Sequence, residues 1–160
     1  MIQKSINSGL SFGLTSGVIT TLGLIVGLNS GTHSRLAIIG GVVVIAIADA
    51  LSDAMGMHLS KESEKDNTKK IWSATIATFF SKLIIALTFI VPIITLNLTN
   101  AIIVSIIWGI FLLTTLSYKV AKSRGKSVKS AISEHLIIAT IVIILSHLAG
   151  KFVANFFGTI

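Results

Sequence analysis

Two aspartates stand one helical turn apart in an otherwise apolar stretch of the chain, and a methionine follows one turn later. They are Asp49, Asp53 and Met57 in the segment 45–64, IAIADALSDAMGMHLSKESE. Residues four apart project from the same side of a helix, so the three side chains share one face. An aspartate near the middle of a bilayer costs about 2.5–3.5 kcal/mol on insertion scales, and membrane proteins rarely carry two without a use for them. This face indicates a site for a divalent cation or for protons.

The chemistry of these side chains favours a metal that exchanges with protons. Two carboxylates one turn apart repel each other when both are ionised, unless a proton or a cation lies between them. A metal ion must displace protons before carboxylates can bind it, which couples metal binding to proton release. Carboxylates suit Mg²⁺, Ca²⁺ or Mn²⁺, and the thioether of Met57 shifts the preference towards softer ions such as Fe²⁺. Methionine is more often plain apolar packing, and that interpretation of Met57 stays open.

Composition places the chain among integral membrane proteins. Its 160 residues are 52% hydrophobic and only 12% charged, about half the charged fraction of a soluble domain. The charges are clustered, which leaves apolar stretches long enough to cross a hydrocarbon core of about 30 Å. Cysteine is absent from the sequence, so no disulfide or thiolate metal site is expected. The net charge of +7 comes mainly from residues between the apolar stretches and does not indicate a nucleic-acid partner.

The pattern predicts an all-α fold, a single domain of five transmembrane helices in the lipid bilayer. The expected spans are residues 9–28, 36–59, 72–96, 101–118 and 132–157. Pro92, the only proline, interrupts the third span. Residues 60–71 form a short charged linker between the second and third spans. The first span is too long and too rich in glycine for a cleaved signal peptide.

Lysine and arginine are distributed unevenly between the two ends of the predicted bundle. One end has ten of them: Lys4, Lys61, Lys65, Lys69, Lys70, Lys119, Lys122, Arg124, Lys126 and Lys129. The opposite end has only Arg35 and Lys151. By the positive-inside rule the N-terminus is cytoplasmic and the C-terminus faces outward. We expect a multi-pass protein, and the shortness of the chain favours the plasma membrane of a prokaryote over an organelle.

One lysine lies inside the third span rather than between spans. Lys82 and Asp49 lie at similar depths from the lysine-rich end, because a helix rises about 1.5 Å per residue. A static Lys82–Asp49 ion pair would explain both charges in a structural or regulatory protein that transports nothing. Alternatively, Lys82 is a tethered cation that competes with a transported one, or it helps to recognise an anionic or zwitterionic solute.

The first span carries two ladders of glycine at four-residue spacing. The first ladder is Gly9, Gly13 and Gly17, and the second is Gly23, Gly27 and Gly31. Small residues at this spacing let two helices approach closely, so the ladders predict either packing within the chain or a homodimer contact through this span. Ser16 and Thr20 of the same helix are candidates for a polar pathway or for proton coupling. Such hydroxyls also bond to carbonyls of their own helix.

The remaining polar residues near the site give weaker signals. His58 lies beside Met57 and is either a ligand at the cytoplasmic mouth or an ordinary interfacial histidine. Glu62 and Glu64 either attract cations or belong, with the neighbouring lysines, to a solvated linker. No phosphate-binding glycine loop, nucleophile elbow or H-E-x-x-H motif occurs in the sequence, so we expect neither an enzyme nor a permanently bound cofactor.

Four segments, taken in order, resemble the vacuolar iron transporter family. SFGLTSGVITTLGLIVGLNSG in the first span resembles the NDGxxTT opening of the family, and ADALSDAMGMHLSKESE resembles its small-residue second helix. ATFFSKLIIALTFIVPII is similar to its third span, and GKSVKSAISEHLIIATIVIILSHLAGKF to its last loop and fifth helix. The resemblance implies a homodimer with a pathway at the subunit interface, lined by the first two spans. It also implies that Fe²⁺ or Mn²⁺ leaves the cytoplasm in exchange for protons.

The acidic residues differ from those of the family pattern. The resemblance places Ser16 where the family has an aspartate, and Met57 where it has a glutamate. Asp53 falls on the methionine position of the family, and Asp49 replaces a small residue. A short linker stands where many members carry a Glu-rich cytoplasmic domain. The expected metal ligands are therefore Asp49, Asp53 and Met57, at positions rearranged from those of the family.

Overall fold

The computed structural model describes residues 2–158, and its regular elements are all helices. They are α1 (Ile2–Thr32), α2 (Arg35–Ser63), α3 (Thr68–Thr88), α4 (Ile90–Thr95), α5 (Leu98–Ser123) and α6 (Val128–Phe157). Five segments are long and apolar enough to cross a membrane, because α3 and α4 together form one span, Thr68–Thr95. The predicted all-α fold is confirmed, and each predicted span has a helix in its place. Most of the helices extend beyond the predicted spans, because polar turns at their ends continue the same helical backbone.

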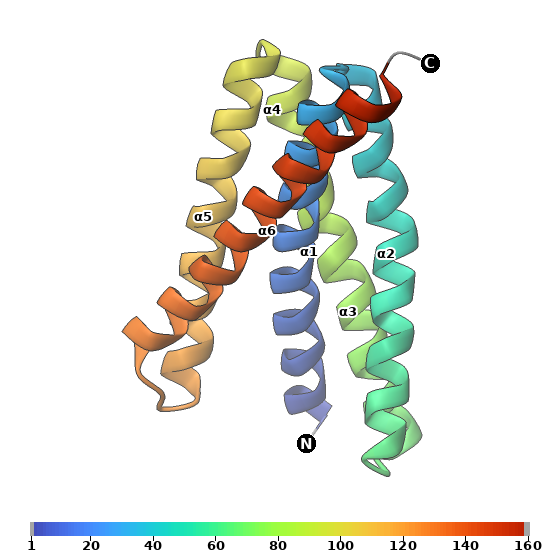
Figure 1. Cartoon of the computed structure of the whole chain (residues 1–160). Coiled ribbons are helices and arrows are strands. Elements are labelled where there is room, and N and C mark those ends of the chain that lie inside the picture. The colour runs from blue at the N-terminus through green and yellow to red at the C-terminus, as the bar shows by residue number, and fades with distance from the viewer. Residues whose placement is uncertain (1, 159–160) are drawn as a thin grey trace.

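Helix α1 lies in the middle of the bundle, and α6 crosses it obliquely (Figure 1). Helix α1 contacts α2, α3, α5 and α6. The start of α1, the α2–α3 connection and the α5–α6 connection lie at one end of the bundle (Figure 1). Lys4 and the basic residues of these two connections gather there, and we refer to this end as the basic end. The α1–α2 turn, the α4–α5 connection and the end of α6 lie at the opposite end.

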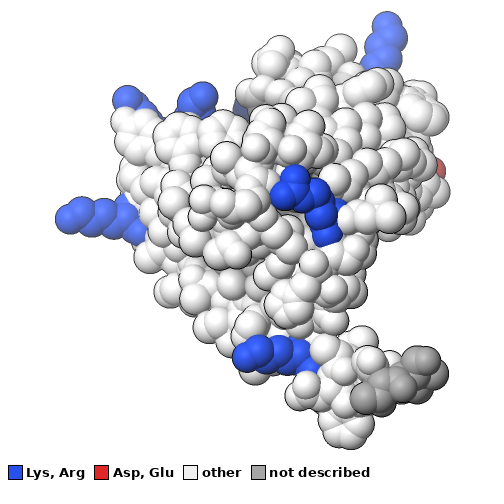
Figure 2. Space-filling model, turned by 90° about the horizontal axis from the view of Figure 1, so that it is seen from above, with Lys and Arg blue, Asp and Glu red and all other residues white. Residues whose placement is uncertain are grey.

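The outer surface of the bundle is apolar. Viewed from above, most of the surface is free of charged residues, and the Lys and Arg side chains stand apart from one another (Figure 2). Large hydrophobic side chains on four helices are more than half exposed, among them Leu51, Ile84, Ile107 and Leu145. Soluble monomers rarely expose apolar surface on this scale. The surface is therefore compatible with a multi-pass membrane protein.

Both glycine ladders of α1 serve close packing within the chain. The first ladder faces α3, where a Cβ on Gly13 would lie 2.5 Å from the carbonyl oxygen of Thr78. The second ladder faces α6, where a Cβ on Gly150 would overlap the carbonyl oxygen of Gly27. The structure thus shows the intramolecular alternative for both ladders. The homodimer stays a prediction.

Gly13→Ala should push α1 away from α3 and lower the free energy of unfolding by about 1–3 kcal/mol. The clash involves the backbone of α3, which cannot turn aside as a flexible side chain can. Gly27→Ala is the matched control in the same helix, because its added Cβ would lie 3.3 Å from the nearest neighbouring atom, the Ser146 carbonyl oxygen, and would need only a small adjustment. Thermal unfolding of the purified protein in detergent measures both variants. Equal effects of the two substitutions would contradict a close contact between α1 and α3.

Pro92 breaks the third span, as predicted. Helix α3 ends at Thr88 and α4 begins at Ile90, which places Pro92 in the first turn of α4. Proline has no N–H for the carbonyl four residues earlier, and its ring crowds that carbonyl. Lys82 lies in the unbroken part of the span, so a regular helix fixes its position.

Candidate functional site

The two aspartates of α2 share one lysine of α3. Lys82 Nζ lies 2.6 Å from Asp49 Oδ2 and 2.5 Å from Asp53 Oδ2. The lysine is only 1% exposed, whereas the side chains of Asp49 and Asp53 are 31% and 21% exposed. The lysine is therefore enclosed, while both acids remain partly open on one side. The Asp49–Lys82 contact predicted from their depths is present, and Asp53 joins it.

A hydroxyl of α1 completes this arrangement. Ser16 Oγ donates a hydrogen bond of 2.7 Å to Asp53 Oδ2 and accepts one of 3.0 Å from Lys82 Nζ. The structure therefore brings together three of the predicted site residues with the predicted lysine, from α1, α2 and α3. We refer to Asp49, Asp53, Lys82 and Ser16 as the charged cluster.

Small residues allow the three helices to approach at the charged cluster. Gly17 follows Ser16, and a Cβ on it would lie 3.2 Å from Lys82 Cγ, so glycine leaves room for the lysine stem. On α2, Ala50 and Ala54 alternate with the aspartates and are buried. Their short side chains let α2 come close enough for its carboxylates to reach the ammonium.

The charged cluster contains more acid than base. When its groups are ionised, two carboxylates face one ammonium and leave one negative charge. Among residues 2–158, the ion pairs of Asp49 and Asp53 are with Lys82 alone. An uncompensated charge inside a helical bundle is costly. A purely static ion pair needs one acid for one lysine, so the second acid leaves a place for a proton or another cation.

The predicted metal ligands do not form a compact set in this structure. In the part of the chain that the structure describes, no three His, Cys, Asp or Glu side chains come together as metal ligands. Met57 lines a neighbouring cavity, one turn beyond Asp53. Asp49 and Asp53 offer two carboxylates to a cation only where the Lys82 ammonium moves aside.

Thr20 and His58 make ordinary structural contacts. Thr20 Oγ1 donates a hydrogen bond of 3.0 Å to the Ser16 carbonyl oxygen of its own helix. His58 Nδ1 lies 3.1 Å from Thr75 Oγ1, and its ring meets the Trp72 ring edge-on with centroids 5.0 Å apart. These are the alternatives that the sequence left open beside a role in the pathway.

The predicted cation-attracting residues, Glu62 and Glu64, lie in the exposed region where α2 ends. Glu64 Oε2 lies 2.7 Å from Lys61 Nζ, and nearby Asp66 Oδ1 lies 2.8 Å from Lys70 Nζ. Glu62 is exposed. Glu64 is exposed, and an ion pair at the surface contributes about 0–1 kcal/mol. These contacts fit the solvated linker that the sequence offered as the alternative.

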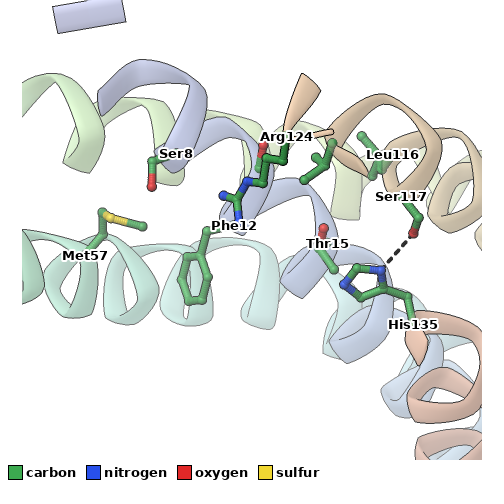
Figure 3. A pocket seen from close by; sticks show the side chains of 10 residues that line it. Ser8, Phe12, Thr15, Met57, Leu116, Ser117, Arg124 and His135 are labelled. Carbon is green, nitrogen blue, oxygen red and sulfur yellow. Dashed lines mark hydrogen bonds between the residues drawn. The ribbon is translucent and has the colours of Figure 1, made fainter. Parts of the chain in front are cut away.

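A cavity of about 360 Å³ opens beside the charged cluster, in the half of the bundle towards the basic end. Its wall comes mainly from α1 and α5, with Met57 from α2 and His135 from α6 (Figure 3). The lining residues are Ser8, Ser11, Phe12, Thr15, Met57, Leu116, Ser117, Val120, Arg124 and His135. The Arg124 side chain points into the cavity (Figure 3). His135 Nδ1 lies 2.9 Å from Ser117 Oγ.

Sequence reasoning did not identify Arg124, Ser117 and His135 as site residues. They meet because α5 and α6 are antiparallel neighbours joined by a short connection, and spacing along the chain does not reveal such a contact. One weak signal was present. Arg124 is the single arginine among the lysines of the basic end.

Comparison of the chain with protein-family models, curated proteins and solved structures gives no match. The resemblance to the vacuolar iron transporters therefore rests on the four sequence segments.

Proposed function

We propose that this chain is a membrane transporter that exchanges a divalent cation for protons at the charged cluster. The observation that carries the proposal is the surplus of one carboxylate over Lys82. One acid and one lysine would suffice to join two helices. The second acid gives the cluster a place for an exchangeable positive charge, in surroundings where an unpaired charge is costly.

Lys82 acts in this proposal as a tethered cation. A metal ion that binds between Asp49 and Asp53 takes the place of the ammonium and of any proton that the carboxylates hold. Metal uptake by the cluster therefore releases protons. When protons return and the ammonium moves back between the acids, the metal leaves. When no metal is bound, the ammonium of Lys82 lies between the two carboxylates and offsets their mutual repulsion.

The cargo that we propose is Fe²⁺ or Mn²⁺, moved out of the cytoplasm. Carboxylate oxygens suit Mn²⁺, and the thioether of Met57 in the adjoining cavity favours Fe²⁺. The uneven distribution of lysine and arginine supports a cytoplasmic N-terminus and an outward C-terminus. The four segments that resemble vacuolar iron transporters support the same cargo. We place the protein in the plasma membrane of a prokaryote.

A homodimer belongs to the proposal, with α2 rather than α1 as the contact helix. Four other helices contact α1, which leaves little of its surface for a second chain. Helix α2 has an exposed stripe at four-residue spacing, made of Gly40, Val44, Ala48, Ser52 and Gly56. An added Cβ at Gly40 or Gly56 would meet nothing within 4 Å. Asp49 and Asp53 adjoin this stripe, so the dimer seam would run beside the charged cluster.

Two rival functions differ from this proposal in what Lys82 does. In a static brace, Lys82 joins α3 to α2 and nothing moves, which its near-complete burial favours. In a transporter of an anionic or zwitterionic solute, Lys82 binds the solute. The ammonium of Lys82 already pairs with two carboxylates, which argues against Lys82 as the binding group for an anionic solute.

Flux measurements in proteoliposomes test the proposal. Fe²⁺, Mn²⁺, Ca²⁺ or Zn²⁺ is added under a pH gradient, and a dye inside the vesicles reports proton movement. We expect proton movement that depends on Fe²⁺ or Mn²⁺, and we expect Asp49→Ala and Asp53→Ala to lose it. No metal-dependent proton movement with the natural sequence would overturn the function. Movement that persists in both variants would overturn only the assignment of the site.

A further inference from the structure

We infer that the cavity between α1, α5 and α6 binds a phosphate oxyanion, with Arg124 as its charged partner. This site is separate from the charged cluster. The inference does not depend on the cargo of the transporter.

Arg124 brings a positive charge to a cavity whose wall contains no carboxylate. The acids that form ion pairs in residues 2–158 have lysine partners elsewhere: Asp49 and Asp53 with Lys82, Glu64 with Lys61, and Asp66 with Lys70. No ion pair of Arg124 occurs among the same residues. A guanidinium presents its donors in a planar fork that matches the oxygens of phosphate.

Three hydroxyls of α1 provide further donors. Ser8, Ser11 and Thr15 line the cavity, and no hydrogen bond of their hydroxyls occurs within residues 2–158. Many hydroxyls elsewhere in the chain are already used on carbonyls of their own helix, as in Thr20 and Thr140. The hydroxyls that line the cavity are therefore free to bind oxygens of an anion.

On the wall of the cavity opposite α1, a hydrogen bond links His135 of α6 to Ser117 of α5. Ser117 Oγ donates a hydrogen bond of 2.6 Å to the Leu113 carbonyl oxygen, which uses the hydroxyl proton. It must then accept the 2.9 Å bond from His135, so His135 Nδ1 carries the proton. This contact joins α5 to α6 at the wall of the cavity.

The position and lining of the cavity favour an anion from the membrane surface. Lys119 and Lys122 of α5 lie near Arg124 at the basic end and raise the local concentration of anions. Phe12, Leu116 and Val120 add apolar wall beside the polar groups. Two sources share the phosphate chemistry, the headgroup of an anionic lipid and inorganic phosphate from solution. A bound phosphate would also cancel the guanidinium charge in the cavity that Met57 lines, which under the proposed function would ease the approach of a cation.

Thermal unfolding of the full chain in detergent tests the inference. The probes are phosphatidylglycerol, phosphatidylcholine as the zwitterionic lipid control, and inorganic phosphate without added lipid. We expect phosphatidylglycerol or inorganic phosphate to raise the unfolding temperature, and the probe that does so identifies the source. Arg124→Gln should raise the half-saturating concentration of that probe about tenfold or more, because it removes the charge and the paired N–H donors that the guanidinium offers to phosphate.

Lys126→Gln is the matched control, because it removes one charge from the same connection but does not line the cavity. We expect it to leave the half-saturating concentration nearly unchanged. Arg124→Lys keeps the positive charge but lacks the planar set of N–H donors of the guanidinium. We expect it to bind the probe more tightly than Arg124→Gln does, which would show that the loss in Arg124→Gln comes from the missing charge and not from a damaged fold. Equal weakening by Arg124→Gln and Lys126→Gln would show diffuse attraction to the connection and overturn the inference. Equal stabilisation by both lipids, or none by any probe, would overturn it as well.

Discussion

Replacing Lys82 by methionine should lower the free energy of unfolding by about 3–5 kcal/mol. Asp49 and Asp53 would then face each other without the ammonium that now lies 2.6 and 2.5 Å from their oxygens. Removing one partner of a buried ion pair leaves an uncompensated charge, which is far more costly than replacing the whole pair. Methionine keeps an unbranched apolar side chain, so the loss would be mainly electrostatic. Denaturant unfolding of the purified protein in detergent measures it.

Two further variants show whether charge is the cause. Lys69→Met removes an exposed lysine of α3 and should change the free energy of unfolding by less than about 0.5 kcal/mol. The triple variant Lys82→Met, Asp49→Asn, Asp53→Asn removes the two carboxylates together with the lysine, and it should recover most of the stability. If the triple variant is as unstable as Lys82→Met alone, packing of the lysine stem rather than charge holds the helices together.

The helices and the Asp49–Lys82 contact could be predicted because both follow from position along single helices. Apolar runs of membrane length mark the five spans, and the missing N–H of Pro92 marks the break in the third. Counting the rise per residue from the same end of the bundle places Asp49 and Lys82 at one depth. None of these steps requires knowledge of how one helix is turned against another.

The rest of the charged cluster depends on the rotation of α1, which spacing does not reveal. Thr15 and Ser16 point in different directions around α1, and only packing against α3 decides that Ser16 meets Lys82. The glycine ladders show the same limit. Their spacing predicts a close approach, but the structure is needed to show that the first ladder meets α3 and the second meets α6. Arg124 and His135 likewise meet only through the pairing of α5 with α6.

Neutralising one aspartate should abolish transport while leaving the protein stable. In Asp53→Asn, Lys82 keeps Asp49 as its partner, so one acid balances one lysine and the surplus charge is gone. The free energy of unfolding should change by less than about 1 kcal/mol, because a balanced ion pair remains. Metal-dependent proton movement should fall about tenfold or more, because an amide can neither carry the exchanged proton nor attract the metal as a carboxylate does.

Asp49→Asn is the matched variant, because it makes the same change one turn away and leaves Lys82 with Asp53 and Ser16. We expect the same combination of retained stability and lost exchange. If the cluster is a static brace, both variants also keep one balanced ion pair and their stability, but the natural sequence then shows no metal-driven proton movement for them to lose. Flux in proteoliposomes and unfolding in detergent, measured on the same preparations, therefore distinguish a transporter from a brace. A stable variant with undiminished metal-driven proton movement would place the exchangeable charge outside the charged cluster.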